Sequence, residues 1–190
     1  TLGATTNNLA ITTVDTAQSF GTFTRRGDDA VWSQDEFAWL RLLATNSIQA
    51  VLDTASAESG AWQVVEFTGA VVQRGLDLWA GGTTANNVTI TSVDTTGSIL
   101  LHNHWLDAGG AVASGVSILG QLLNPTTVRF TRETTAGSRV VEMAWEVVDF
   151  SDGTSVQYGT AALVTASATN LAITQVDTSR SVALLSGLYG

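Results

Sequence analysis

The sequence predicts an all-β protein built from two tandem, antiparallel β-sandwich-like modules. One segment, which we call the VDT motif, occurs three times. A second segment, the Trp block, occurs twice, and β-branched residues dominate both segments, as is typical of strands. The VDT motif reads NNLAITTVDTAQS at 7–19, NNVTITSVDTTGS at 86–98 and TNLAITQVDTSRS at 169–181, and the Trp block reads AWQVVEFTGAVVQRG at 61–75 and AWEVVDFSDGTSVQYG at 144–159.

Motifs and blocks alternate along the chain with a spacing of about 80 residues, which is longer than a solenoid repeat and long enough for a small domain. We expect a first β-module at residues 1–85 and a second at residues 86–168. The third motif copy, in residues 169–190, begins a module that is not completed. A strand with an apolar face requires a partner. We therefore expect this copy either to close a sheet of its own chain or to clasp a neighbouring subunit.

The remaining elements are expected to be strands, with two ambiguous segments. Residues 127–150 form a hairpin candidate whose turn is TTAGS, and SDGTS makes the next turn. Residues 33–46 begin with a plausible helix cap and carry apolar residues at helical spacing, so helix and non-helix stay open there. Their counterpart, residues 113–124, is interrupted by glycine and favours a strand.

Composition excludes several classes of function. The 190 residues are 44% hydrophobic and 13% charged, and the net charge is −9. Such a surface repels nucleic-acid phosphates and anionic membranes, so we expect neither as a partner. There is no cysteine, hence no disulfide or thiolate metal site, and no apolar run approaches the roughly 18 residues that span a bilayer. The chain starts at Thr1 without a signal sequence, so either a leader was removed or the first residues are not represented.

Residues shared by the repeats are interpreted as structural. Each VDT motif carries an aspartate, at Asp15, Asp94 and Asp177. A calcium site would need a clustered Asp-x-Asp loop, which is missing, so we interpret these carboxylates as acceptors of backbone N–H bonds that set a turn. Trp62 and Trp145 are expected to anchor the two cores, with sugar stacking as the alternative.

No segment predicts catalysis or a cofactor. The sequence contains no glycine-rich phosphate loop and no nucleophile elbow. Glu66 and Asp149 hold matching places in different modules, whereas the carboxylates of a glycosidase face one cleft. We therefore expect a protein that is not an enzyme.

The segment LHNHWLDAGG at 101–110 is unique to the second module. His102 and His104 are two residues apart, so on a strand they point the same way, and Asp107 follows. Two histidines and a carboxylate are ligands for zinc or another transition metal. The alternative is a polar loop with two solvent-facing imidazoles.

The combination of ITxVDTxxS, WQVVEF and VQRG resembles the tandem β-modules of structural proteins in tailed bacteriophages. The resemblance covers most of the chain, because every copy contributes. It implies a virion component outside the cell: a capsid decoration, tail-associated or fibre-like protein, expected to be a homotrimer. Its partners would be copies of itself and other capsid or tail proteins.

Module size and strand order also resemble the H-type lectin sandwich. That resemblance implies a glycan-binding module for surface attachment, with a surface glycan as the partner. The residues it would use are the tryptophans that the repeats do not share: Trp32, Trp39, Trp79 and Trp105.

Overall fold

The computed structural model describes residues 5–26, 37–52, 59–79, 81–107, 117–132, 140–160 and 170–184. This part of the chain is all-β, as predicted, and contains no helix that could cross a membrane. The strands are β1 (Thr5–Ala10), β2 (Ser19–Arg26), β3 (Ala38–Ala44), β4 (Ser47–Leu52), β5 (Ser59–Glu66), β6 (Ala70–Trp79), β7 (Ala85–Thr89), β8 (Ser98–Asp107), β9 (Leu119–Asn124), β10 (Thr127–Thr131) and β11 (Val140–Phe150).

Two antiparallel sheets have the same strand order, β1-β4-β3 and β7-β10-β9. In each sheet a strand of the VDT motif pairs with the second strand of a hairpin. The backbone beyond the motif strand is held in the same way, because Ile11 N donates to Asn46 O at 2.9 Å and Ile90 N donates to Thr126 O at 3.0 Å. The two sheets therefore place corresponding residues of the repeats in corresponding positions.

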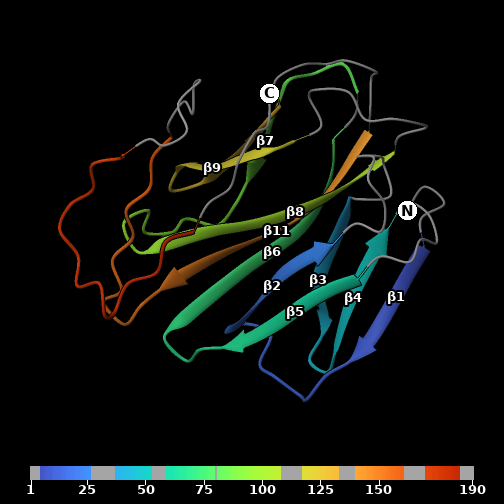
Figure 1. The fold of residues 1–190 in the computed structure, drawn as a ribbon, viewed down its shortest axis with the longest axis horizontal. Helices are drawn as coiled ribbons and strands as arrows, with labels where there is room; N and C mark the ends of the chain where they lie inside the picture. The colour runs from blue at the N-terminus through green and yellow to red at the C-terminus, as the bar shows by residue number, and fades with distance from the viewer. Residues whose placement is uncertain are drawn as a thin grey trace.

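The other two sheets differ in a way that the repeat does not predict. β2 pairs with β5, and the matching strands β8 and β11 pair with each other. β6 follows β5 in the sequence but joins the second repeat, where it pairs with β11 and gives the order β6-β11-β8 (Figure 1). The predicted boundary at residues 85 and 86 separates the repeated sequences, yet the two repeats share this sheet.

The main core surrounds β11. One face of this strand carries Val141, Met143, Trp145 and Val147, which pack with buried residues of the β7-β10-β9 sheet. The opposite face meets the first repeat, and there Ala144 packs with residues of β3, β4 and β8. Because both faces are covered, β11 is buried continuously from residue 141 to residue 148. The residues that pack on the Trp145 face of β11 include Ile118, Leu122, Val128 and Phe130, and those on the Ala144 face are Trp39, Val51 and Trp105.

The helical alternative for residues 33–46 is wrong over residues 38–44, which form β3. Trp39 packs against the second repeat on one face of this strand. Leu40 and Leu42 pack on the other face in a cluster with Ile48. A strand buried on both faces is apolar at successive positions, which also satisfies helical spacing. In the counterpart segment Leu119–Asn124 is a strand, as favoured, and residues 33–36 and 113–116 lie outside the described residues.

The third VDT motif does not close a sheet. Residues 170–184 form no strand, and Leu171 and Ile173 are 60% and 67% exposed. Strands of this motif pair with β4 and β10, and each of those strands already has a neighbour on both sides. The expectation of an intramolecular closing strand is therefore wrong for these residues, and clasping of a neighbour stays a prediction.

Candidate functional site

The aspartate of each VDT motif sets the same turn. Its carboxylate accepts a hydrogen bond from the backbone N–H two residues further on, and these bonds are Ala17 N to Asp15 Oδ1 (2.9 Å), Thr96 N to Asp94 Oδ1 (2.8 Å) and Ser179 N to Asp177 Oδ1 (3.0 Å). The hydroxyl and the amide of Thr96 lower the pKa of Asp94, and those of Ser179 lower the pKa of Asp177. The three carboxylates serve the backbone of their own turns.

The two repeated acids attach the Trp block to these turns. Glu66 Oε1 accepts a hydrogen bond from Asp15 N at 2.9 Å. Asp149 Oδ1 accepts one from the Ser98 hydroxyl, also at 2.9 Å. Glu66 holds the end of β5 to the turn before β2, and Asp149 holds the end of β11 to the first residue of β8. Both are structural roles within one repeat.

The two histidines of the second repeat lie on β8 among aromatic side chains. The His102 ring contacts Phe130 with 5.5 Å between ring centroids, and His104 lies 5.2 Å from Phe37 by the same measure. Burial lowers the pKa of His102 from its ordinary value of 6.5 to about 4, so this imidazole is neutral at physiological pH. The solvent-facing alternative is wrong for His102, because its Nδ1 is buried.

The described residues contain no group of three histidine, cysteine, aspartate or glutamate side chains that could hold a metal ion. The backbone of Asp107 ends β8, opposite Val140, but its side chain lies outside the described residues. The metal site at His102, His104 and Asp107 therefore stays a prediction, because the side chain of its carboxylate lies outside the described residues.

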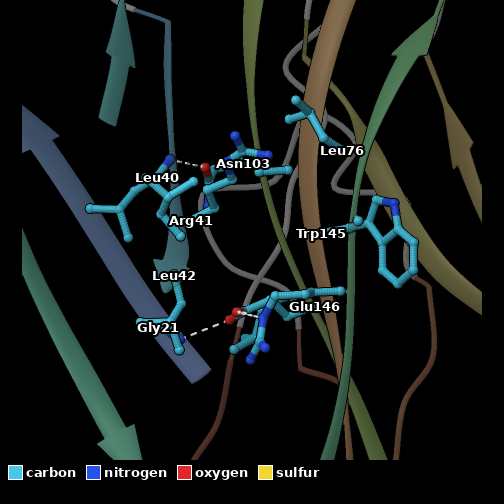
Figure 2. Close-up of a pocket in the computed structure, with 13 residues that line it drawn as sticks. Gly21, Leu40, Arg41, Leu42, Leu76, Asn103, Trp145 and Glu146 are labelled. Carbon is cyan, nitrogen blue, oxygen red and sulfur yellow. Dashed lines mark hydrogen bonds and ion pairs between the residues drawn. The ribbon is translucent and has the colours of Figure 1, made fainter. Parts of the chain in front are cut away.

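A pocket of about 240 Å³ lies where the two repeats meet (Figure 2). In Figure 2, Glu146 points toward Gly21, whereas the indole of Trp145 points away from it. Gly21 N donates to Glu146 Oε2 at 2.8 Å, and Leu40 N donates to Asn103 Oδ1 at 2.6 Å. Side chains of the second repeat thus cap backbone groups of β2 and β3 in the first.

The charged groups that line this pocket are already bonded within the chain, and Arg41 Nε donates to Gln49 Oε1 at 3.0 Å. Arg74 donates through Nε to Glu146 Oε1 at 3.0 Å and through its two terminal nitrogens to the carbonyls of Thr16 and Ser19. Both carboxylate oxygens of Glu146 therefore have a partner within the chain. The residues around the pocket hold the two repeats together, because their charged groups form hydrogen bonds within the protein. We call this cluster the joint between the repeats.

The two tryptophans of the Trp block differ sharply in burial. Trp145 is 8% exposed on β11, but Trp62, its counterpart on β5, is 39% exposed. The prediction that Trp62 anchors a core is therefore wrong. The cause is the neighbouring strand: β6 covers Trp145, with Gly75 directly opposite it. Among the described strands, Trp62 has a residue across from it on one side, Phe23 of β2.

The edge of β5 is the candidate functional site. On one side β5 pairs with β2, and no other described strand pairs with it. Its residues are exposed from Ser59 to Gln63 and again at Val65 and Glu66. An open strand edge presents unpaired N–H and C=O groups, which are a template for a further strand. The matching edge of β11 is filled by β6.

Residues 152–160 leave β11 along the route that β6 takes from β5. Val72 N donates to Ala17 O at 2.9 Å, and the corresponding Val156 N donates to Thr96 O at 2.7 Å. Residues 152–160 are exposed apart from Val156, which is half-buried, and they form no strand. The chain thus carries a second β6-like segment with no sheet to join.

Three of the four tryptophans that the lectin resemblance requires are not on the surface. Trp39, Trp79 and Trp105 are buried, and Trp39 Nε1 donates to Glu142 Oε2 at 2.9 Å inside the core. Trp32 lies outside the described residues. The expectation that Trp39, Trp79 and Trp105 form a sugar-binding surface is therefore wrong.

No family model, curated protein or solved structure matches the chain. VQRG and VQYG align in the sequence, but the repeat by itself predicts no role for Gly75, Gly159, Gln73 or Gln157. Their repetition within each Trp block is the available signal, and the pairing of β6 with β11 shows its meaning.

Proposed function

We propose that this chain is a non-enzymatic structural subunit that assembles into a larger particle through its β-modules. The observation that carries the proposal is the unequal treatment of the two Trp blocks. β11 receives a strand from the other repeat, whereas β5 keeps an open edge. A protein that joins its repeats by passing a strand from one to the next has the means to join further copies in the same way.

Exposed apolar side chains support the same proposal. Val71 and Leu78 on β6 are more than half exposed, and so are several residues that follow β11. Exposed apolar side chains are available for contact with another protein, and a contact that covered them would remove them from water. The residues after β11 are Tyr158, Leu171, Ile173, Val182 and Leu184.

The particle that we propose is a bacteriophage virion, with the chain as a capsid decoration, tail-associated or fibre component. This rests on the resemblance of ITxVDTxxS, WQVVEF and VQRG to phage structural modules. A strand passed from one copy to the next makes a head-to-tail contact, which closes into a ring or continues as a filament. A homotrimer corresponds to closure after three copies.

The test is the mass of the purified chain over a range of concentrations, measured by sedimentation equilibrium. We expect a monomer that converts to a trimer or a larger species as concentration rises. A chain that stays monomeric up to its solubility limit would contradict the proposal. Electron microscopy of the associated species then separates closed rings from filaments.

A further inference from the structure

We propose that residues 152–160 of one molecule add as a strand to the open edge of β5 in a second copy of this chain, with Gly159 opposite Trp62. The inference rests on the assembly function proposed above and specifies the partner, the strand and the register. It follows from four features of the described residues, beginning with the strand that the chain already passes between its repeats.

β6 is the template for the donated strand. After β5 the chain turns and crosses to the second repeat, and Gln73 then holds the next VDT motif: its Nε2 donates to Thr91 O at 2.9 Å, and its Oε1 accepts from Thr91 N at 2.7 Å. Gln157 makes the same two bonds with Thr174, at 3.1 Å and 2.7 Å. Residues 152–160 and the third VDT motif are therefore already arranged like β6 and the start of the second repeat.

The register follows from the pairing of β6 with β11. In that pair Val148 lies opposite Val72, Val147 opposite Gln73 and Trp145 opposite Gly75. In the alignment of the two Trp blocks, each β11 residue corresponds to a residue of β5, and each β6 residue corresponds to one in 152–160. The expected antiparallel pairs at the β5 edge are therefore Val65 with Val156, Val64 with Gln157, and Trp62 with Gly159.

The glycine explains why this register is specific. A Cβ atom on Gly75 would lie 2.4 Å from the Trp145 ring, so only glycine fits beneath that indole. A Cβ atom on Gly159 would meet no described residue within 4 Å. Glycine is disfavoured in strands unless a close approach requires it. By analogy with Gly75, the side chain that would approach Gly159 is an indole, and Trp62, which corresponds to Trp145, is exposed.

The strand that receives residues 152–160 belongs to another molecule, because of the direction in which these residues leave β11. β6 follows β5 in the chain and pairs with β11, the strand that corresponds to β5 in the second repeat. The bond from Val156 N to Thr96 O places residues 152–160 on the same route away from β11. Along that route they would reach a third strand of the β5 and β11 type. The sequence has only two Trp blocks, so its own chain does not supply a third. Both edges of β11 are occupied by β6 and β8. The open edge that fits is β5 of a second copy.

The experiment compares Gly159→Val with Ser155→Val in the full chain by sedimentation equilibrium. Because Gly159 has open space around it, the valine leaves the fold of the single chain unchanged but clashes with Trp62 across the contact. We expect its self-association to weaken on the order of 10- to 100-fold. Ser155 aligns with Val71 of β6, so Ser155→Val adds the same side chain at a position where the template already carries it, and association should be unchanged.

Each further outcome is informative. Combining Gly159→Val with Trp62→Ala exchanges the large and the small residue, and restored association would support direct pairing. If Gly159→Val associates as the wild type does, the proposed register is overturned while the assembly function stands. If the wild type itself does not associate, both fail. Unchanged thermal unfolding of the single chain in Gly159→Val excludes a folding defect as the cause.

Discussion

β5 and β11 carry the same Ala-Trp-x-Val-Val pattern in opposite environments. β5 is exposed along most of its length, and β11 is buried on both faces from residue 141 to residue 148. The difference lies in the neighbours: β11 has β6 and β8 beside it and packed side chains on each face. Among the described strands, β5 pairs with β2 alone, and its Val64 packs against the cluster of Leu40, Leu42 and Ile48. Strand burial is therefore set by context, and β5 has the sequence of a central strand at an open edge.

Replacing the two tryptophans with alanine gives the largest expected difference. Trp145→Ala removes a buried side chain from the main core and should lower the free energy of unfolding by about 4 kcal/mol. Trp62→Ala removes a half-exposed ring and should cost about 1 kcal/mol. Urea denaturation of dilute protein measures both. Equal losses would show that Trp62 is as well packed as Trp145, and β5 would then not be an open edge in solution.

The histidine beside Trp145 should make stability depend on pH. The pKa of His102 is about 4 in the fold and 6.5 unfolded, so the folded state favours the neutral ring. Its contribution is complete above pH 6.5 and is lost as pH falls toward 4, which amounts to about 3 kcal/mol.

His102→Phe tests this contribution, because phenylalanine is the residue at the matching position of the first repeat, Phe23. The variant should lose most of the decline in unfolding free energy between pH 6.5 and 4. A decline of the same size in the variant would assign it to carboxylates instead.

Glu146 on β11 belongs to the joint between the repeats, and the aligned residue on β5, Gln63, does not. Replacing each with alanine should therefore lower the free energy of unfolding by different amounts. Glu146→Ala leaves Gly21 N and the Arg74 guanidinium short of an acceptor. We expect a loss of about 2 kcal/mol, because the pair is only partly exposed. Gln63→Ala should change the free energy of unfolding by less than about 0.5 kcal/mol in dilute protein. Chemical denaturation measures both losses. If Glu146→Ala leaves the free energy of unfolding unchanged, Glu146 does not hold the repeats together.

The smallest expected difference is between two glycines. Gly75→Ala places a methyl group against Trp145 and should cost about 2 kcal/mol. Gly159→Ala, in open space, should change the stability of the single chain by less than about 0.5 kcal/mol. A large loss from Gly159→Ala in dilute protein would mean that residues 152–160 are already packed within the chain.

The sequence was sufficient to predict the all-β class because β-branched residues alternate within repeated segments. It did not predict β3, since a strand buried on both faces has apolar residues at successive positions. Nor did it predict that Trp62 is exposed, because the Trp block reads the same in both copies and only the path of β6 separates them.

The candidate site shows the same limit. VQRG and VQYG align in the sequence, but their role depends on which Trp block each one faces. That choice is a long-range pairing, and strand pairing across repeats leaves no local signal in either segment. His102 and His104 do share a strand, yet the aromatic rings packed against them could not be inferred from LHNHWLDAGG.

The most direct test of strand donation uses the absence of cysteine in the wild-type chain. Gln63→Cys and Tyr158→Cys chains are prepared separately, mixed and oxidised. The proposed register places these two residues opposite each other, within reach of a disulfide. We predict a covalent dimer that contains one chain of each variant, and far less of it when Thr68→Cys replaces Gln63→Cys. Equal dimer yields in both mixtures, or none in either, would contradict the donation of residues 152–160 to β5.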